Sequence, residues 1–192
     1  MSLYHFGKWL FKLILGVLYR VRVEGLENVP PEGGLVVCAN HIHAWDPPLV
    51  GVILPRPVHF MAKEELFRNP VLRFLLYRVG AFPVRRGKPD RAALRHSIQV
   101  VKDGGVLGVF PEGTRNPTGE LQAAKGGAAF IVLRTGAPVL PVAIIGPYRL
   151  FGRVRVRVGK PFHVQVDPDT PDRIAAAGQQ IMEGIRVLLT NG

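Results

Sequence analysis

Short apolar runs alternate with longer amphipathic segments along most of the chain. The runs are rich in Val, Leu, Ile and Phe, which predicts buried strands at residues 35–39, 59–62, 81–84, 106–110 and 139–145. The segments around them predict helices at residues 46–54, 70–79, 90–102, 126–135 and 171–190. Alternation of this kind is typical of an α/β fold. We therefore expect a layered domain with a mostly parallel or mixed central sheet flanked by helices.

One further strand has a different character. Arg153, Arg155 and Arg157 alternate with valines, and successive side chains of a strand point to opposite faces. The pattern predicts a strand with one apolar and one cationic face. Since no repeat, low-complexity tract or linker interrupts residues 23–192, we expect them to form a single domain.

The amino-terminal residues 1–22 combine apolar and basic side chains and contain no acidic residue. Lys8 and Lys12 interrupt the apolar run, so the segment does not have the pattern of a clean membrane span. On a helix, one stripe opposite a wide apolar face consists of His5, Lys8, Lys12, Gly16 and Tyr19. This is typical of an amphipathic helix at a membrane interface, although a helix packed on the domain's own core would share the pattern. A signal peptide fits less well, because no small-residue cleavage site follows.

The charge and cysteine content narrow the class of protein. The 192 residues carry a net charge of +11, which favours anionic partners such as a membrane surface, phosphates or nucleic acid. The apolar residues in segment 1–22 favour the membrane, so we expect no nucleic-acid partner. The single cysteine, Cys38, lies in an apolar run. It allows no internal disulfide, suits a reducing compartment and predicts a buried side chain without a chemical role.

His41 and Asp46 stand in the loop after the predicted strand at residues 35–39. A histidine can act as a general base near neutral pH, and a carboxylate that binds one ring nitrogen fixes the tautomer and stabilises the protonated ring. Pro47 and Pro48 come next, so Asp46 is also well placed to cap a helix. By its spacing alone, the pair is a weak signal.

Few residues could form a covalent intermediate. The two serines are Ser2, in the amino-terminal segment, and Ser97, in the middle of a predicted helix. With Cys38 expected to be buried, Thr114 is the remaining candidate. We therefore favour direct transfer to an acceptor hydroxyl, which needs a base and no protein nucleophile.

Two segments at strand ends carry more specific information. Asn40 directly precedes His41, giving the pattern NHxxxxD as far as Asp46, and residues 110–115 are FPEGTR. With these blocks the chain resembles the glycerophospholipid acyltransferase family, whose 1-acylglycerol-3-phosphate acyltransferases carry both in this order. Weaker matches to the family's other blocks and spacers lie at residues 61–66, 80–86, 125–126 and 139–142. The resemblance covers residues 20–160.

The resemblance implies roles for the matching residues. His41 would be the general base and Asp46 its partner. The contacts to the acceptor or the transition state would be Glu112, Gly113, Thr114 and Arg115. Lys63 and Arg86 would help to hold a phosphate. Departures from the usual family residues are His43 for a serine, Arg85 for an acidic residue and Asn116 for a serine. These changes leave the base in place and bear on the choice of acceptor.

The resemblance also implies the reaction and its setting. A fatty acyl group would pass from a thioester of acyl carrier protein or coenzyme A to the free hydroxyl of 1-acylglycerol-3-phosphate (lysophosphatidic acid). The product would be phosphatidic acid, an intermediate of phospholipid biosynthesis. The thioester already activates the acyl group, so no cofactor is expected. The enzyme would work at the cytoplasmic face of the cell membrane as a peripheral or monotopic protein.

Other functions stay open at this point. Another lysophospholipid or glycerol 3-phosphate is an alternative acceptor, and a basic membrane-binding or nucleic-acid-binding protein without catalysis would share the charge. His41, His43 and Asp46 could also form part of a hydrolytic metal site. No companion ligand motif accompanies them, so we expect no metal.

Overall fold

The computed structural model describes residues 13, 15–85 and 90–190 and has a β-sheet at its centre. The strands are β1 (Arg20–Glu24), β2 (Leu35–Ala39), β3 (Val58–Lys63), β4 (Phe82–Val84), β5 (Val106–Val109), β6 (Val139–Ile145) and β7 (Arg153–Val158). The α-helices are α2 (Asp46–Ile53), α3 (Pro70–Arg78), α4 (Arg91–Lys102), α5 (Gly126–Thr135) and α6 (Arg173–Thr190). Two short 3₁₀ helices are η1 (Leu26–Asn28) and η2 (Glu64–Arg68).

The sheet has the strand order β1-β7-β6-β2-β5-β3-β4. Neighbouring strands from β6 to β4 are parallel, β7 is antiparallel to β6, and β1 is parallel to β7. This mixed sheet confirms the expected α/β class. Because the carboxyl ends of parallel strands meet at one edge, the segments that follow β2, β3, β4, β5 and β6 all leave the sheet on the same side.

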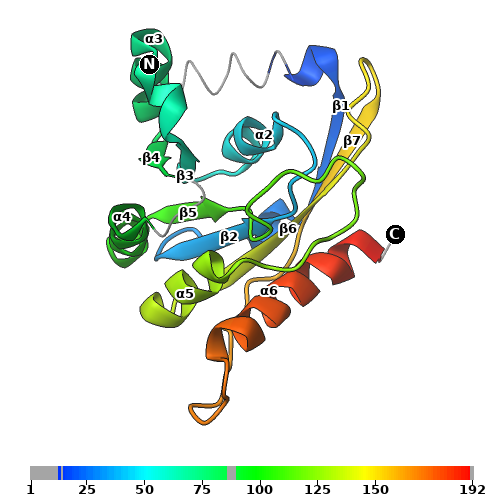
Figure 1. The fold of residues 1–192 in the computed structure, drawn as a ribbon. Coiled ribbons are helices and arrows are strands. Elements are labelled where there is room, and N and C mark those ends of the chain that lie inside the picture. The colour runs from blue at the N-terminus through cyan, green and yellow to red at the C-terminus, as the bar shows by residue number, and fades with distance from the viewer. Residues whose placement is uncertain (1–12, 14, 86–89, 191–192) are drawn as a thin grey trace.

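Helices cover both faces of the sheet (Figure 1). One face carries α2 and the helical turn before β1, and the other carries α4, α5 and α6. The alternating side chains of β2 serve both layers: Val37 lies in the first core, with α2, and Val36 and Cys38 lie in the second. Burial raises the pKa of the Cys38 thiol to about 12, which fits the expectation of a side chain without a chemical role.

Most elements predicted from the sequence occur within one or two residues of their expected bounds. The strands β6 and β7 and the helix α5 match those bounds at both ends. The strand with one cationic face is β7, whose valines are buried in the first core.

The predicted amino-terminal helix ends earlier than expected. Residues 1–12 and 14 lie outside the described residues, and residues 13 and 15–18 are helical. Arg20, Val21 and Arg22 belong to β1, which pairs with β7, so the boundary at residue 22 is corrected. These residues alternate basic and apolar side chains, which is the period of a strand and not of a helix.

The described part of this segment packs on the domain with one side only. Leu15 is 2% exposed, whereas Leu13 and Val17 are 50% and 60% exposed. Tyr19, predicted on the polar stripe, is buried instead, and its ring meets that of Tyr148 edge to face. In the part of the chain that the structure describes, no helix has the length and apolar content to cross a bilayer.

Candidate active site

His41 and Asp46 form a buried, hydrogen-bonded pair after the carboxyl end of β2. His41 Nδ1 lies 2.8 Å from Asp46 Oδ2, and the two side chains are 8% and 0% exposed. Among the described residues, Nδ1 is the ring nitrogen of His41 that has a hydrogen-bond partner. The carboxylate thus holds the proton on Nδ1, and Nε2 is free to accept another.

The Asp46 carboxylate accepts four hydrogen bonds. Besides His41, its Oδ2 accepts from the backbone N–H groups of Ile42 and His43, each at 2.7 Å. Its Oδ1 accepts from the hydroxyl of Tyr148 at 2.7 Å. Charge-assisted bonds of this kind offset the cost of burying the carboxylate and fix its orientation.

The predicted capping role of Asp46 is wrong. The helix α2 begins at Asp46 itself, the cap residue is Trp45, and no side chain bonds the first turn. A cap at Asp46 would bond the N–H of Pro48 or Leu49, but proline has no N–H, and the N–H of Leu49 donates to the carbonyl of Trp45. The carboxylate points instead to the loop before it, where three donors converge on Oδ2.

Tyr148 is a site residue that sequence analysis missed. It follows β6, 102 positions after Asp46, and its ring stacks on that of His43 with the centroids 4.5 Å apart. Burial, together with the neighbouring Asp46 carboxylate, raises the pKa of the Tyr148 hydroxyl, so this group stays protonated and donates. The sequence signal was its position shortly after a strand that ends at the same edge as β2.

The FPEGTR segment supports His41 from the side of β5. The Phe110 ring stacks on the His41 imidazole, with the centroids 4.2 Å apart and the planes at 23°. Glu112 is 2% exposed, and its two oxygens accept from the backbone N–H groups of His41 at 2.9 Å and Gln122 at 3.1 Å. The N–H of Asn116 donates to the His41 carbonyl at 2.7 Å. Glu112 thus positions the loop that carries the base, and its predicted contact with an acceptor stays a prediction.

Asn40 ties the same loop to β6. Its side-chain amide donates to the carbonyl of Ile144 at 2.9 Å and accepts from the N–H of Ile144 at 2.7 Å. Asn40 is 2% exposed, so both halves of a buried amide are satisfied by one backbone residue. The residue before the base therefore fixes the distance between β2 and β6 at the site.

The other residues of the FPEGTR segment lie nearer the surface. Gly113 has a φ of 68°, a left-handed conformation that favours glycine, and a Cβ there would come within 2.7 Å of the Lys125 side chain. Thr114 and Arg115 are exposed. They are open to solvent at the end of β5, and their contact with an acceptor stays a prediction.

The residues predicted to hold a phosphate have different outcomes. Lys63 is the last residue of β3 and is exposed at the same edge as the base. Arg86 lies outside the described residues. Arg85 stands where the family usually has an acidic residue. Its Nε lies 3.7 Å from Oε2 of Glu64, and both side chains are exposed.

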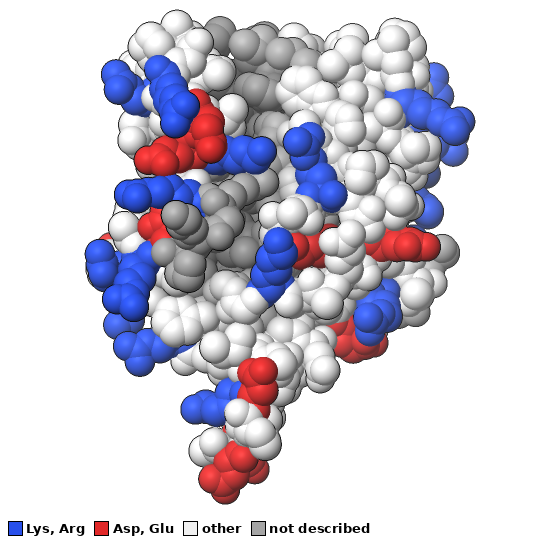
Figure 2. Space-filling model, in the orientation of Figure 1, with Lys and Arg blue, Asp and Glu red and all other residues white. Residues whose placement is uncertain are grey.

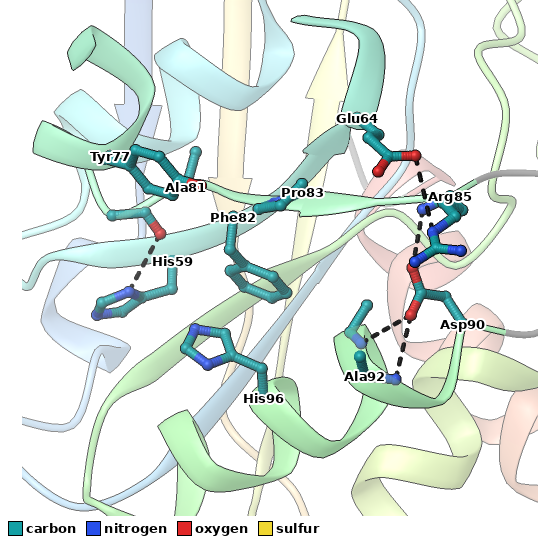
Figure 3. A pocket seen from close by; sticks show the side chains of 12 residues that line it. His59, Glu64, Tyr77, Ala81, Phe82, Pro83, Arg85, Asp90, Ala92 and His96 are labelled. Atoms are coloured by element: carbon teal, nitrogen blue, oxygen red, sulfur yellow. Dashed lines mark hydrogen bonds and ion pairs between the residues drawn. The ribbon is translucent and has the colours of Figure 1, made fainter. Parts of the chain in front are cut away.

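A cleft of about 530 Å³ lies beside the edge strand β4 (Figure 3). Its lining side chains come from β3, β4, α3 and α4 and include His59, Phe82, Arg85, Asp90 and His96. Neither His41 nor Asp46 lines it, so the cleft is separate from the base.

The described residues around His41 do not form a set of metal ligands. His41 uses Nδ1 to bond Asp46, and the His43 ring stacks on Tyr148. Within residues 13, 15–85 and 90–190, no group of three or more His, Cys, Asp or Glu side chains could hold a metal ion.

Comparisons with known proteins agree with the geometry. The family model described as Acyltransferase matches residues 20–145. The 1-acyl-sn-glycerol-3-phosphate acyltransferase of Bacillus subtilis is 34% identical over 97% of this chain and 96% of its own. That of Borreliella burgdorferi is 33% identical over 69% of this chain and 54% of its own. The crystal structure of the 1-acyl-sn-glycerophosphate (LPA) acyltransferase PlsC from Thermotoga maritima has a TM-score of 0.72 at 28% identity, covering 97% of this chain and 78% of that one.

The family match takes in His41, Asp46 and the strands on either side of them, and it ends three residues before Tyr148. It includes the loop after β2, the FPEGTR segment after β5 and the strand β6 that Asn40 bonds. The similarity to the Bacillus subtilis protein extends over nearly the whole of both chains. This protein belongs to the acyltransferase family.

Proposed function

We propose that this protein transfers a fatty acyl group from an acyl thioester to the free hydroxyl of 1-acylglycerol-3-phosphate. The observation that carries the proposal is the buried His41–Asp46 pair, in which the carboxylate binds Nδ1, so that Nε2 is the nitrogen that can take a proton. The names of the similar proteins from Bacillus subtilis and Borreliella burgdorferi support this acceptor.

His41 serves as the general base of the reaction. Its Nε2 takes the proton of the acceptor hydroxyl while the hydroxyl oxygen attacks the thioester carbonyl. The tetrahedral intermediate collapses, the C–S bond breaks, and the leaving sulfur takes the proton from the imidazolium. Asp46 stabilises the positive charge that the ring carries between these steps. No protein nucleophile takes part, in keeping with the burial of Cys38 and Ser97.

Basic side chains at the carboxyl edge of the sheet hold the acceptor phosphate. Lys63 and Arg115 are exposed in segments that leave this edge, and the family resemblance adds Arg86. An arginine can bind a phosphate through two parallel hydrogen bonds, which fixes the direction of the acceptor. Binding of this kind brings the free hydroxyl to Nε2 of His41 and makes the attack effectively intramolecular.

The enzyme works at the cytoplasmic face of the cell membrane, as a peripheral or monotopic protein, with acyl carrier protein or coenzyme A as the thioester carrier. The support is the sequence of residues 1–19, which is apolar and basic and lacks acidic residues, and the net charge of +11. A basic residue near an anionic bilayer contributes about 1 kcal/mol to binding. Because the thioester supplies the activated group, the reaction uses no further cofactor.

An acyl-transfer assay tests this function. The donor is a radiolabelled fatty acyl group carried either by acyl carrier protein or by coenzyme A. Each donor is tested with 1-acylglycerol-3-phosphate, with glycerol 3-phosphate and with another lysophospholipid. We expect phosphatidic acid from the first acceptor, and a rate lower by about 10²- to 10⁴-fold in His41→Ala. His163→Ala, at an exposed histidine of the same chain, is the matched control and should keep the wild-type rate. A near-wild-type rate in His41→Ala would show that the base is wrong, and transfer only to another acceptor would show that the substrate is wrong.

A further inference from the structure

The helix α3 exposes most of its apolar side chains. None of its residues is buried, and Val71, Phe74 and Leu75 are 66%, 51% and 51% exposed. Val79, directly after the helix, is 42% exposed. Phe74 and Leu75 stand three and four positions after Val71, and Val79 stands four after Leu75, so the four lie on one side of the helix. Leu72 and Tyr77 of the same helix are 44% and 55% exposed. The apolar face of a surface helix normally packs against the core, whereas this one faces away from it.

The charges on α3 itself are basic, and the exposed acidic residues Glu64 and Glu65 lie in η2, which contacts it. Residues 69–79 contain two arginines and no acidic residue. The guanidinium carbon of Arg78 lies 5.0 Å from the centroid of the Phe74 ring, so a positive charge stands at the border of the apolar face. An arginine whose stem follows an apolar surface while its head stays in water suits the boundary between hydrocarbon and lipid headgroups.

A second group of exposed apolar side chains lies on the same side of the sheet as α3. Its members are 50% to 63% exposed and are Leu13, Val17, Leu150 and Phe151. The N–H of Phe151 donates to the carbonyl of Leu18 at 2.7 Å, which joins the two segments of the group. In Figure 1 this group and α3 stand at opposite ends of the face that carries α2.

The charges differ between the end of the molecule that carries α3 and the opposite end. Figure 2 shows basic and acidic side chains next to each other at the upper left, where α3 lies, and acidic side chains at the lower tip. This tip is the loop before α6, which contains Asp167, Asp169 and Asp172. An anionic surface is attracted to the two arginines of α3 and repelled by the tip.

We propose that α3 is a second membrane-contact surface, which lies on an anionic bilayer through Val71, Phe74, Leu75 and Val79, with Arg78 among the lipid headgroups. Together with the amino-terminal segment, it attaches the domain at two points and fixes the tilt of the sheet against the lipid surface. Two weak contacts on one rigid body bind more tightly than either alone. The inference rests on the proposed function, because acceptor and product are then lipids of that surface.

Vesicle flotation tests the surface of α3 directly. The full chain and Phe74→Ser/Leu75→Ser are mixed with vesicles of equal parts phosphatidylcholine and phosphatidylglycerol. We expect the partition coefficient of the double variant to fall by about tenfold or more, because two half-exposed apolar side chains no longer enter the bilayer. Arg78→Gln should bind these vesicles about fivefold more weakly and should bind pure phosphatidylcholine like the wild type.

A matched control comes from the opposite face of the sheet. Ile174→Ser/Val187→Ser changes two side chains of α6 that are 40% and 43% exposed, and it should float like the wild type. Equal losses in the two double variants would overturn the proposal, as would unchanged flotation of Phe74→Ser/Leu75→Ser. Unchanged flotation with loss of self-association in sedimentation would assign the face to a second copy of the chain. Unchanged flotation with a higher KM for an acyl carrier protein donor would assign it to that protein.

Transfer to a short-chain acceptor dissolved as monomers separates this inference from the proposed function. The variant Phe74→Ser/Leu75→Ser should keep the wild-type turnover on the dissolved acceptor and lose it on vesicles. Loss of both activities would overturn a role limited to the bilayer. Absence of transfer in the wild type would refute the proposed function, and the flotation result would still decide the role of α3.

Discussion

The hydroxyl of Tyr148 gives a direct test of how the base is held. Tyr148→Phe removes one of the four donors to Asp46 and keeps the ring that stacks on His43 and meets Tyr19. Oδ1 of Asp46 then loses its donor in a fully buried position, whereas Oδ2 keeps all three of its own. The perturbation therefore acts on the carboxylate without removing its bond to His41.

The size of the effect follows from these contacts. A hydrogen bond to a charged group contributes about 1.5 to 3 kcal/mol, so the free energy of unfolding should fall by about that amount. Because His41 keeps its own bond, kcat should fall by about five- to tenfold, which is less than the whole contribution of a general base. Without the hydroxyl of Tyr148, the Asp46 carboxylate interacts more strongly with the protonated ring of His41. The acid limb of the kcat/KM profile should therefore move to higher pH.

The pKa of the Tyr148 hydroxyl adds a stability test with a defined sign. Burial and Asp46 raise this pKa in the folded protein, so the hydroxyl stabilises the fold below the unfolded value of about 10, and this stability is lost as the pH rises beyond it. Tyr148→Phe should lack that part of the alkaline loss. Unfolding curves over the alkaline range measure the difference.

The matched control is Tyr19→Phe, which removes a hydroxyl from the neighbouring ring and leaves the bond from Tyr148 to Asp46 intact. It should change kcat and the pH profile little. Lower stability of Tyr148→Phe with an unchanged kcat and pH profile would refute the positioning role. A loss as large as that of His41→Ala would refute it as well, because it would place Tyr148 at the reacting atoms.

Three other groups give independent predictions. Glu112→Gln leaves one acceptor oxygen for two backbone N–H groups, so urea unfolding should show a loss of about 1 to 3 kcal/mol with little change in the acceptor KM; the reverse pattern would indicate acceptor contact. Cys38, with a thiol pKa of about 12, should resist iodoacetamide at neutral pH until the protein unfolds, and native-state labelling would contradict its burial. Asp90 has a carboxyl pKa lowered by the N–H groups of Ala93 and Arg85. Asp90→Ala should therefore cost about 1 kcal/mol at neutral pH, and this difference should vanish in strong acid, where Asp90 is protonated in both states.

The parts of the site that could be predicted follow short strands that are apolar and buried. The runs before His41 and before the FPEGTR segment are buried over their whole length, so both loops could be placed at the edge of a sheet. The parallel pairing of β2 with β5 then brings the two loops together. Local pattern was sufficient here because each functional residue follows its strand directly.

The parts that could not be predicted depend on partners distant in sequence. The short strand β1 alternates Arg and Val, and its place in the sheet comes from pairing with β7 near the other end of the chain. Tyr148 shows no local signal for a bond to Asp46, and the direction of that carboxylate depends on donors in a loop of irregular backbone. The sequence identified the pair and left open what fixes its orientation.

The pairing of the first and last strands links the start of the chain to the chemistry. Tyr19 stands directly before β1 and touches Tyr148, whose hydroxyl bonds the partner of the base. A protease that cleaves after Tyr19 would therefore remove a support of the Asp46 carboxylate as well as the segment that we propose binds the lipid surface. The cleaved enzyme would turn over more slowly even on acceptors dissolved in water. A movement of the amino-terminal segment would therefore be transmitted to Asp46 through Tyr19 and Tyr148.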